Sequence, residues 1–421
     1  MPVVTIVGAQ WGDEGKAKII EHLGARVDLL VRFAGGANYV QSLVSGGERV
    51  VLQLVPAAVM RRGSTCLLGQ GMAIDPSLLL DEIASLVAVE AMNGKLFVCE
   101  RAHVVLPHHA LLDSLRNEAE GASGAKRRGV GPCYADKVAR RGIQIADLLR
   151  PDAFRQKLAE SVEAAAPTIR ALGGEVPALA PIVDRYLACG EELEDHMVDG
   201  SQSVLRFVRE GRNVVLEALL GTMVDLDHGH YPYVVGASTV AGAAPVGAGI
   251  PPRAVDRVVG VAKAYSTRAG AGPFPAELEG AIAAHLVEKG REVGATTSRP
   301  RRCGMFAVPE VRYAADVNGF DMLALTKLDV LTGLPEIPLC TGYEIDGVIM
   351  TSPPFEHASR AKPRIETLPG WTESLEDCRR FDELPENARR YVDAIERHTG
   401  LRIASVGVGP DRTIVHEDIL G

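Results

Sequence analysis

Val3-Val4-Thr5-Ile6-Val7 runs directly into Gly8-Ala9-Gln10-Trp11-Gly12-Asp13-Glu14-Gly15-Lys16, and this stretch decides the fold. The apolar, β-branched run predicts a buried strand, and the pattern from Lys16 to Leu23 predicts a helix. A glycine-containing turn between a strand and a helix presents backbone N–H groups and the positive end of the helix dipole to an anion. Gly15 and Lys16 add close backbone approach and a cation, so the turn predicts a polyphosphate site.

The turn departs from the strict phosphate-binding loop pattern at two positions. Gln10 stands where the first glycine belongs, and Ala17 stands where a serine or threonine would bind Mg²⁺. The acidic pair Asp13 and Glu14 is unusual beside a phosphate, but it fits a site in which Asp13 binds a metal or takes a proton. The alternative is an ordinary strand-to-helix turn with a capping aspartate.

Strand-like and helix-like segments alternate along the rest of the chain. Short apolar runs predict strands at Val3–Val7, Leu29–Phe33, Val50–Val55, Leu96–Val98, Val214–Leu216, Val258–Ala262 and Leu323–Leu325. Helical patterns occur at Lys16–Leu23, Pro76–Val89, Ala110–Glu120, Asp152–Ala166, Ala178–Ala188, Val198–Glu210, Leu278–Lys289 and Pro385–Thr399. This alternation predicts an α/β fold with a large, mostly parallel central sheet covered by helices, related to the P-loop nucleotide-binding folds.

No composition shift or internal repeat divides the chain. Residues 1–421 are therefore expected to form a single domain with helical and loop insertions. The Ala/Gly/Pro-rich stretch Val235–Pro252 fits either a linker or a loop near a site, and the sequence does not decide between them.

The composition argues against several classes of protein. The 421 residues contain 45 Lys and Arg against 54 Asp and Glu, a net charge of −9, without a long basic run, so no nucleic-acid surface is expected. The seven cysteines form no C-x-x-C pair, which argues against a disulfide framework or a structural zinc site. We find neither a signal peptide nor a run of ~18 apolar residues, so we expect a soluble, cytoplasmic protein without a membrane partner.

Two further segments carry side chains suited to a nucleotide or a dicarboxylate. Thr326-Lys327-Leu328-Asp329 follows the predicted strand Leu323–Leu325, where an aspartate could accept hydrogen bonds from guanine while the lysine stem covers the ring. A surface Lys/Asp pair is the alternative. The arginines of residues 294–302 (GATTSRPRR) suit a carboxylate or a phosphate, or else form a solvated loop. His228 and His230 are spaced i, i+2, which favours a polar turn over a metal site.

Taken in order, these segments resemble the adenylosuccinate synthetases, and the resemblance runs nearly end to end. The family-specific strings are QWGDEGK at residues 10–16, DKVARRG at 136–142, DLDHG at 225–229, AYSTR at 264–268, GAGPFP at 270–275, GATT at 294–297, TKLDVL at 326–331 and GPDR at 409–412.

The resemblance implies a GTP- and Mg²⁺-dependent ligase that joins L-aspartate to C6 of IMP and forms adenylosuccinate, in purine nucleotide biosynthesis. In this family an active-site aspartate removes the N1 proton while GTP phosphorylates O6, and the aspartate amine then displaces that phosphate. The resemblance also implies a homodimer in which Arg140 reaches the nucleotide site of the neighbouring subunit.

Carried over position by position, the resemblance gives roles to individual residues. Asp13 corresponds to the base, Lys16 to the residue that holds the transferring phosphate, and Gln41 to the position of the family's general-acid histidine. Mg²⁺ would meet Asp13 and the backbone carbonyl of Val40. The GTP-binding positions are Gly12, Glu14, Gly15, Lys16, Lys18, Ser42, Arg301, Lys327, Asp329, Gly407 and Gly409. The acceptor-binding positions are Asn38, Lys126, Arg140, Leu220, Val235 and Arg299. The aspartate-binding positions are Ala295, Thr296, Thr297, Arg299 and Arg301.

The departures from the family pattern fall mostly where the acceptor nucleotide would bind. Gln41 replaces the histidine, and a carboxamide does not exchange a proton near neutral pH. Val40 replaces a glycine, Leu220 a glutamine and Val235 a threonine, and Ala125-Lys126-Arg127-Arg128-Gly129 lacks the hydroxyls that grip the IMP phosphate. Elsewhere Ala17 replaces a glycine, Pro300 an arginine and Gly407 a serine.

These departures leave three functional hypotheses. The first is a divergent adenylosuccinate synthetase that uses IMP, with Lys126 and Arg127 compensating for the lost hydroxyls. The second is a paralogue that ligates aspartate to a different nucleotide or amide-bearing acceptor. The third is a nucleotide-binding protein that has lost catalysis, which the retained Asp13 argues against and Gln41 argues for.

Overall fold

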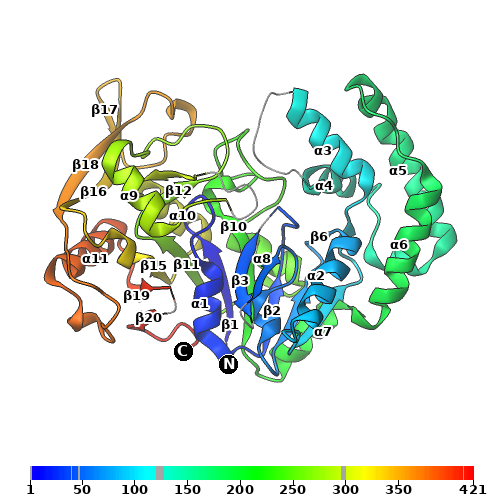
Figure 1. The fold of residues 1–421 in the computed structure, drawn as a ribbon, viewed down its shortest axis with the longest axis horizontal. Coiled ribbons are helices and arrows are strands. Elements are labelled where there is room, and N and C mark those ends of the chain that lie inside the picture. The colour runs from blue at the N-terminus through cyan, green and yellow to red at the C-terminus, as the bar shows by residue number, and fades with distance from the viewer. Residues whose placement is uncertain (1, 39, 46–47, 120–127, 295–299, 411) are drawn as a thin grey trace.

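The computed structural model describes the whole chain except residues 1, 39, 46–47, 120–127, 295–299 and 411. Its centre is a sheet of ten described strands in the order β20-β19-β15-β11-β1-β10-β2-β5-β7-β9 (Figure 1). Neighbouring strands pair in parallel, except that β20 runs antiparallel to β19. The strands are β1 (Val3–Gly8), β2 (Leu29–Arg32), β5 (Thr65–Leu68), β7 (Lys95–Cys99), β9 (Met197–Val198), β10 (Val214–Gly221), β11 (Arg257–Lys263), β15 (Met322–Thr326), β19 (Ile403–Gly409) and β20 (Arg412–Val415). The predicted mostly parallel sheet is confirmed.

Helices cover both faces of this sheet. On β1, Val3 and Val7 belong to one hydrophobic core and Val4 and Ile6 to the other, because alternate side chains of a strand point to opposite faces. The first core includes α7 (Gly200–Arg209), α8 (Ala244–Ala248), α9 (Gly280–Gly290), α10 (Val308–Asn318) and α11 (Glu386–Thr399). The second includes α1 (Lys16–Leu23), α2 (Pro76–Ala88), α5 (Pro151–Ala171) and α6 (Leu179–Leu193). Burial on both faces explains why the strands read as continuous apolar runs.

Two more described helices, α3 (Pro107–Ala119) and α4 (Val130–Val138), lie on the same side of the molecule as α5 and α6 (Figure 1). Most of the predicted helices are confirmed, and α1 has the predicted limits. In the part of the chain that the structure describes, no helix is both long enough and apolar enough to cross a membrane.

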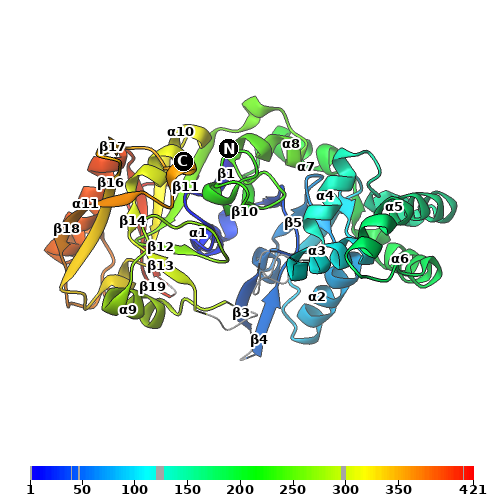
Figure 2. The same ribbon diagram turned by 90° about the horizontal axis from the view of Figure 1, so that it is seen from above.

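The prediction of Val50–Val55 as a strand of the central sheet is wrong. β4 (Glu48–Leu52) pairs antiparallel with β3 (Gln41–Ser45), and this hairpin stands away from the sheet (Figure 2). After β4, the backbone N–H groups of residues 53–55 donate to the carboxylate of Glu82 on α2. Leu52, Leu54 and Val55 are fully buried. The apolar pattern therefore correctly indicates that these residues are buried, but they do not belong to the central sheet.

A second, smaller sheet was not predicted. It contains β14 (Phe306–Ala307), β16 (Glu336–Ile345), β17 (Val348–Met350) and β18 (Lys362–Pro369), and it lies beside α11 (Figure 1). β18 is largely exposed, so it lacks the continuous apolar run by which the central strands were recognised.

The stretch Val235–Pro252 is packed into the body of the protein. It contains α8, and Ala241, Ala244, Ala248 and Ile250 are buried in the first core. A linker would expose these side chains, so the packing argues against the linker; a loop near a site stays a prediction.

The parallel arrangement determines where the site forms. It brings the carboxyl ends of β1, β10, β11 and β15 to one edge of the sheet, the usual place for ligands in such folds. The turn after β1 is fastened to its neighbours there. The Ala9 N–H donates to Val261 O at 2.8 Å, the Thr222 hydroxyl donates to Gly8 O at 2.8 Å, and the Thr326 hydroxyl donates to Glu14 O at 2.6 Å.

One buried carboxyl group couples the fold to pH. Glu310, in the first turn of α10, accepts a hydrogen bond at 2.5 Å from the hydroxyl of Tyr343 on β16. Its other carboxyl oxygen has no hydrogen-bond partner among the described residues. Burial raises the pKa of Glu310 to about 7, so the folded protein binds a proton here that the unfolded chain has already released above pH 4.5.

Replacing Glu310 by glutamine is expected to remove this pH dependence. The Glu310 contribution to stability is fully present below pH 4.5 and is lost as pH rises through about 7, because the folded-state pKa is the higher one. Glu310→Gln keeps an acceptor for Tyr343. The difference in the free energy of unfolding between variant and wild type should therefore shift in favour of the variant by up to about 3 kcal/mol between pH 4.5 and pH 8. Urea unfolding across this range measures the difference, with the exposed Glu344→Gln as control. A difference that does not change with pH would contradict the assignment.

Candidate functional site

The turn between β1 and α1 adopts a backbone that few residues tolerate. Gly12, Asp13 and Gly15 have φ angles of 94°, 60° and 88°, all in the left-handed region. Glycine enters this region without steric cost, and aspartate enters it more readily than most residues. Gly15 is the N-cap of α1, so the turn leads directly into the helix N-terminus. Asp13 is held in the turn with its side chain 32% exposed.

Gln10 explains why the first glycine of the strict loop pattern is absent. Its buried side-chain amide donates to the backbone carbonyls of Lys263 and Tyr265, each at 3.2 Å, and its carbonyl oxygen accepts the Lys263 N–H at 3.0 Å. The side chain therefore joins the turn to the end of β11. A glycine at this position could not make these bonds.

Glu14 points into the turn and is completely buried. Its Oε1 accepts the backbone N–H groups of Gly12 at 2.8 Å and Gln10 at 3.2 Å, and its Oε2 lies 2.7 Å from Lys16 Nζ. Burial would raise the pKa of Glu14, but Lys16 and the N–H donors outweigh burial and hold the pKa below its usual value. The carboxylate leaves no room beside it, because a β-carbon at Gly8 or Gly221 would lie 2.4 Å from it.

A second buried carboxylate, Glu292, lies at the centre of a cluster of cations. Its Oε1 is 3.1 Å from Lys263 Nζ and 2.6 Å from Lys327 Nζ, and its Oε2 is 2.9 Å from Arg301. The Tyr265 hydroxyl also donates to it at 2.6 Å. Burial would raise the pKa of Glu292, but Lys263 and Lys327 hold it well below its usual value.

Arg301 connects this cluster to the turn after β1. Its Nε lies 3.0 Å from Asp13 Oδ2, while its Nη1 lies 2.9 Å from Glu292 Oε2. The neighbouring carboxylates raise the pKa of Arg301 against the opposite effect of burial, so the guanidinium stays charged. A guanidinium held between two carboxylates has a fixed orientation, and it fixes the orientation of Asp13 in turn.

The predicted guanine-binding residues lie beside this network. Lys327 has a φ of 57° directly after β15, and its Nζ donates to Gly290 O at 2.9 Å. Lys18 donates to the backbone carbonyl of Gly409. A β-carbon at Gly407 would lie 3.2 Å from the Lys327 backbone nitrogen, so β19 runs close to the end of β15. Burial raises the pKa of Asp329, partly offset by Lys18.

The predicted acceptor-binding residues are placed only in part. Leu220 lies near the end of β10. A β-carbon added at Gly12 would be 3.7 Å from its side chain, so Leu220 borders the turn. Asn38 is partly buried, and its Oδ1 has no hydrogen-bond partner among the described residues. Val235 is partly buried and its N–H donates to Val224 O at 2.9 Å, whereas Arg140 is exposed just after α4 with a φ of 61°.

Several predicted residues lie wholly or partly outside the described part of the chain. Lys126 and residues 295–299, which include Ala295, Thr296, Thr297 and Arg299, lie outside the described residues. The backbone of β3 begins at Gln41 and continues through Ser42, but their side chains also lie outside what is described. Val40, the proposed carbonyl ligand of Mg²⁺, is partly buried just before β3.

The histidine motif forms the predicted polar turn. The carboxylate of Asp225 accepts the backbone N–H groups of Asp227 at 2.9 Å and His228 at 3.1 Å. His230, in contrast, is buried between the rings of Trp11 and Phe355, with centroids 4.8 and 4.7 Å away. Burial lowers the pKa of His230 to about 4, so it serves as a neutral aromatic side chain.

Sequence reasoning missed Glu292, Lys263 and Tyr265, which hold the cation cluster together. Tyr265 was noted only as part of a family string. Glu292 stands two residues before the small-residue segment that begins at Gly294, which was a weak signal. Its partners lie at residues 263, 301 and 327, and only the fold brings them to one carboxylate.

The sheet, the turn into a helix N-terminus and the cations at the carboxyl edge define an α/β enzyme of the nucleotide-dependent class. The family model for adenylosuccinate synthetase matches residues 5–416 of the chain. The chain belongs to the adenylosuccinate synthetase family, whose members are GTP-dependent ligases.

Individual relatives agree over the full length of the chain. An adenylosuccinate synthetase of Sorangium cellulosum is 45% identical over 428 residues, which cover 99% of both chains. One of Myxococcus xanthus is 44% identical over 424 residues, 98% of this chain and 97% of that one. The structure of fully ligated adenylosuccinate synthetase from Plasmodium falciparum superposes with a TM-score of 0.91 at 35% identity, covering 99% of this chain and 100% of that chain.

Replacing Glu292 by glutamine is expected to destabilise the protein. The change leaves Lys263, Lys327 and Arg301 without their shared anion, and breaking a buried ion pair typically costs about 3–5 kcal/mol. The loss should appear in urea unfolding at pH 7, with Glu288→Gln on the exposed face of α9 as control. Because the pKa of Glu292 is depressed, the advantage of the wild type should shrink as pH falls below 4.5. Equal stability at pH 7 would show that the carboxylate does not hold the cluster.

Proposed function

We propose that this chain joins L-aspartate to IMP in a GTP- and Mg²⁺-dependent reaction that yields adenylosuccinate, GDP and phosphate. The observation that carries the proposal is the position of Asp13. Its carboxylate is partly exposed in a left-handed turn at the carboxyl end of β1, 3.0 Å from Arg301 and directly beside the buried Glu14–Lys16 pair. Full-length family membership supplies the reaction to which this geometry is matched.

Asp13 is the proposed base. Arg301 orients its carboxylate, and its partial exposure leaves an oxygen that can accept the N1 proton of IMP. The same residue suits Mg²⁺, which prefers carboxylate and carbonyl oxygens, with the Val40 carbonyl as a second ligand. Glu14 is unsuited to either role, because its oxygens already receive Lys16 and two backbone N–H groups. When bound, Mg²⁺ would neutralise charge on the phosphates during transfer.

Lys16 is proposed to hold the transferring phosphate from a fixed position. Its ammonium group has three donors, and Glu14 occupies one of them at 2.7 Å. The side chain is 2% exposed, so its charge is held in a region with little water. Phosphorylation of O6 by GTP gives a leaving group at C6, and the aspartate amine then forms the C6–N bond as phosphate departs.

Lys327 and Asp329 are the proposed guanine-binding pair. Glu292 and the Gly290 carbonyl fix the end of Lys327, which leaves its stem to lie along a ring. The Asp329 carboxylate can accept two hydrogen bonds from a guanine edge. Lys18, Gly407 and Gly409 lie beside them, which supports a base-binding role for this corner of the edge. Arg301 and the segment 295–299 are proposed to take the aspartate substrate.

The proposal that the protein forms a homodimer rests on the residues at the acceptor positions. The described acceptor positions include two apolar residues, Leu220 and Val235, and Asn38, whose Oδ1 has no hydrogen-bond partner among the described residues. We propose that Arg140 of a second copy completes this pocket, together with Lys126 of the same chain. Arg140 is exposed after α4, as such a role requires.

The first test measures phosphate release from GTP together with adenylosuccinate formation. We expect both only when IMP, L-aspartate and Mg²⁺ are all present. Asp13→Ala should lower kcat by at least about a hundredfold, the typical contribution of a general base, while thermal unfolding confirms that the fold is kept. Glu21→Ala, on the exposed side of α1, is the matched control.

The outcomes of this test are distinct. Turnover that survives Asp13→Ala at the wild-type rate would contradict the assignment of the base. The substitutions at Gln41, Leu220 and Val235 are the reason to run other nucleotides in parallel. Leu220 and Val235 lack hydrogen-bonding groups that IMP would use, and Gln41 lacks a group that exchanges a proton near neutral pH. Phosphate release with another nucleotide and not with IMP would identify a different acceptor.

Restoring histidine at position 41 is expected to raise the IMP-dependent rate. An imidazole exchanges a proton near neutral pH and a carboxamide does not, so Gln41→His should increase kcat by at least about tenfold. The increase should fade at higher pH, as the histidine loses its proton. Gln41→Asn is the control, because it keeps the carboxamide and shortens the side chain. An unchanged rate in Gln41→His would mean that another group protonates the leaving oxygen.

A further inference from the structure

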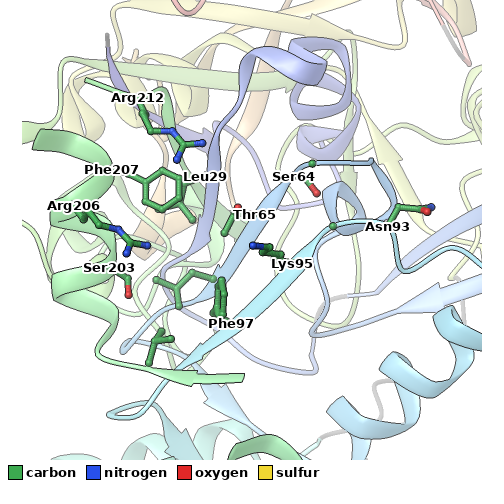
Figure 3. A pocket seen from close by; sticks show the side chains of 14 residues that line it. Leu29, Ser64, Thr65, Asn93, Lys95, Phe97, Ser203, Arg206, Phe207 and Arg212 are labelled. Atoms are coloured by element: carbon green, nitrogen blue, oxygen red, sulfur yellow. The ribbon is translucent and has the colours of Figure 1, made fainter. Parts of the chain in front are cut away.

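A cavity of about 500 Å³ opens at the amino edge of the central sheet, the edge opposite the catalytic turn (Figure 3). Its floor is a row of first residues of neighbouring parallel strands. Leu29 of β2 pairs with Thr65 of β5, and Thr65 pairs with Lys95 of β7. Leu67 and Phe97 stand two residues further along β5 and β7 and therefore share the same face. The volume is in the range of pockets that hold small molecules.

Helix α7 forms the wall of this cavity. Ser203, Arg206 and Phe207 are spaced i, i+3 and i+4, so they lie on one face of the helix. Phe207 is buried, and the guanidinium of Arg212 lies 4.3 Å from its ring centroid. The cavity therefore has an aromatic wall that is fixed on one side by a stacked cation.

The charge of the cavity is opposite to that of the whole chain. The chain has a net charge of −9, yet the described residues that line the cavity include three cations, Lys95, Arg206 and Arg212, and no acid. Arg212 is paired with Asp28 at 3.2 Å and with Glu210 at 3.7 Å. Lys95 and Arg206 have no carboxylate partner among the described residues, and Figure 3 shows their charged ends pointing toward one another.

We propose that this cavity is a second ligand-binding site, for a small molecule that carries a phosphate group on an aromatic ring. The phosphate lies between Lys95 and Arg206, where a dianion meets two converging cations and the hydroxyls of Thr65 and Ser203. The ring packs against Phe207 and Phe97, over the apolar side chains of Leu29 and Leu67. A purely apolar ligand would leave both cations unmatched, and a simple inorganic anion would leave most of the cavity empty.

The site is separate from the proposed catalytic site. The cavity contains the first residues of β2, β5 and β7, whereas the catalytic turn follows the last residue of β1, which runs parallel to them. No described residue that lines the cavity belongs to the network of Asp13, Arg301 and Glu292. Binding should therefore persist when the catalytic site is filled.

The test uses 1-naphthyl phosphate as the probe, with binding measured by titration calorimetry. The full-length protein is first saturated with IMP and a non-hydrolysable GTP analogue, so that catalytic-site binding does not contribute. We expect the probe to bind at least about tenfold more tightly than inorganic phosphate or 1-naphthol, because each of these offers only half of the interactions. A crystal soaked with the probe should show it against Phe207.

Two variants locate the binding. The double variant Lys95→Gln, Arg206→Gln should weaken probe binding at least about tenfold and leave kcat unchanged, since neither residue is near the catalytic turn. Arg209→Gln is the matched control, because Arg209 is exposed on α7 and does not line the cavity. Probe binding that is lost on saturation with IMP and the GTP analogue, or that is unaffected by the double variant, would overturn the proposal. So would equal affinities for the probe and for inorganic phosphate.

Discussion

The buried carboxylate of Glu292 is the interaction on which the carboxyl edge depends. It contacts Lys263 at the end of β11, Lys327 after β15, and Arg301 before β13 (Arg302–Gly304), and it offsets part of their charge. Three cations brought together without it would repel one another in a region of low dielectric. Because Arg301 also contacts Asp13, the position of the proposed base depends on Glu292, a residue that is fully buried.

Glu14 is a second buried carboxylate, and it holds the turn after β1 in place through fewer partners. It binds Lys16 and the N–H groups of Gly12 and Gln10, and it fills the space that Gly8 and Gly221 leave open. The two buried acids thus hold cations in place. Asp13 alone of these three acids keeps part of its side chain exposed. This division separates the two carboxylates that organise the site from the partly exposed one that is the proposed base.

The sequence was sufficient where the signal is local. β1, the glycine turn and α1 are consecutive, so periodicity and turn residues identify them together, and α1 has its predicted limits. The sequence failed where burial does not imply sheet pairing, as at Val50–Val55, which pass through a hairpin and then bind Glu82. It also failed for Glu292, because residues 263, 292, 301 and 327 form one cluster only after the strands have been ordered.

The charge balance at the carboxyl edge bears on what a triphosphate needs there. Four cations, Lys16, Lys263, Arg301 and Lys327, meet three carboxylates, Asp13, Glu14 and Glu292, so their balance is 4 − 3 = +1. A single net charge cannot match a polyanion. For a bound triphosphate, further positive charge would come from the α1 N-terminus and from backbone N–H groups, and in the proposed function from a divalent cation beside Asp13. The network of this edge is thus arranged to orient its charges.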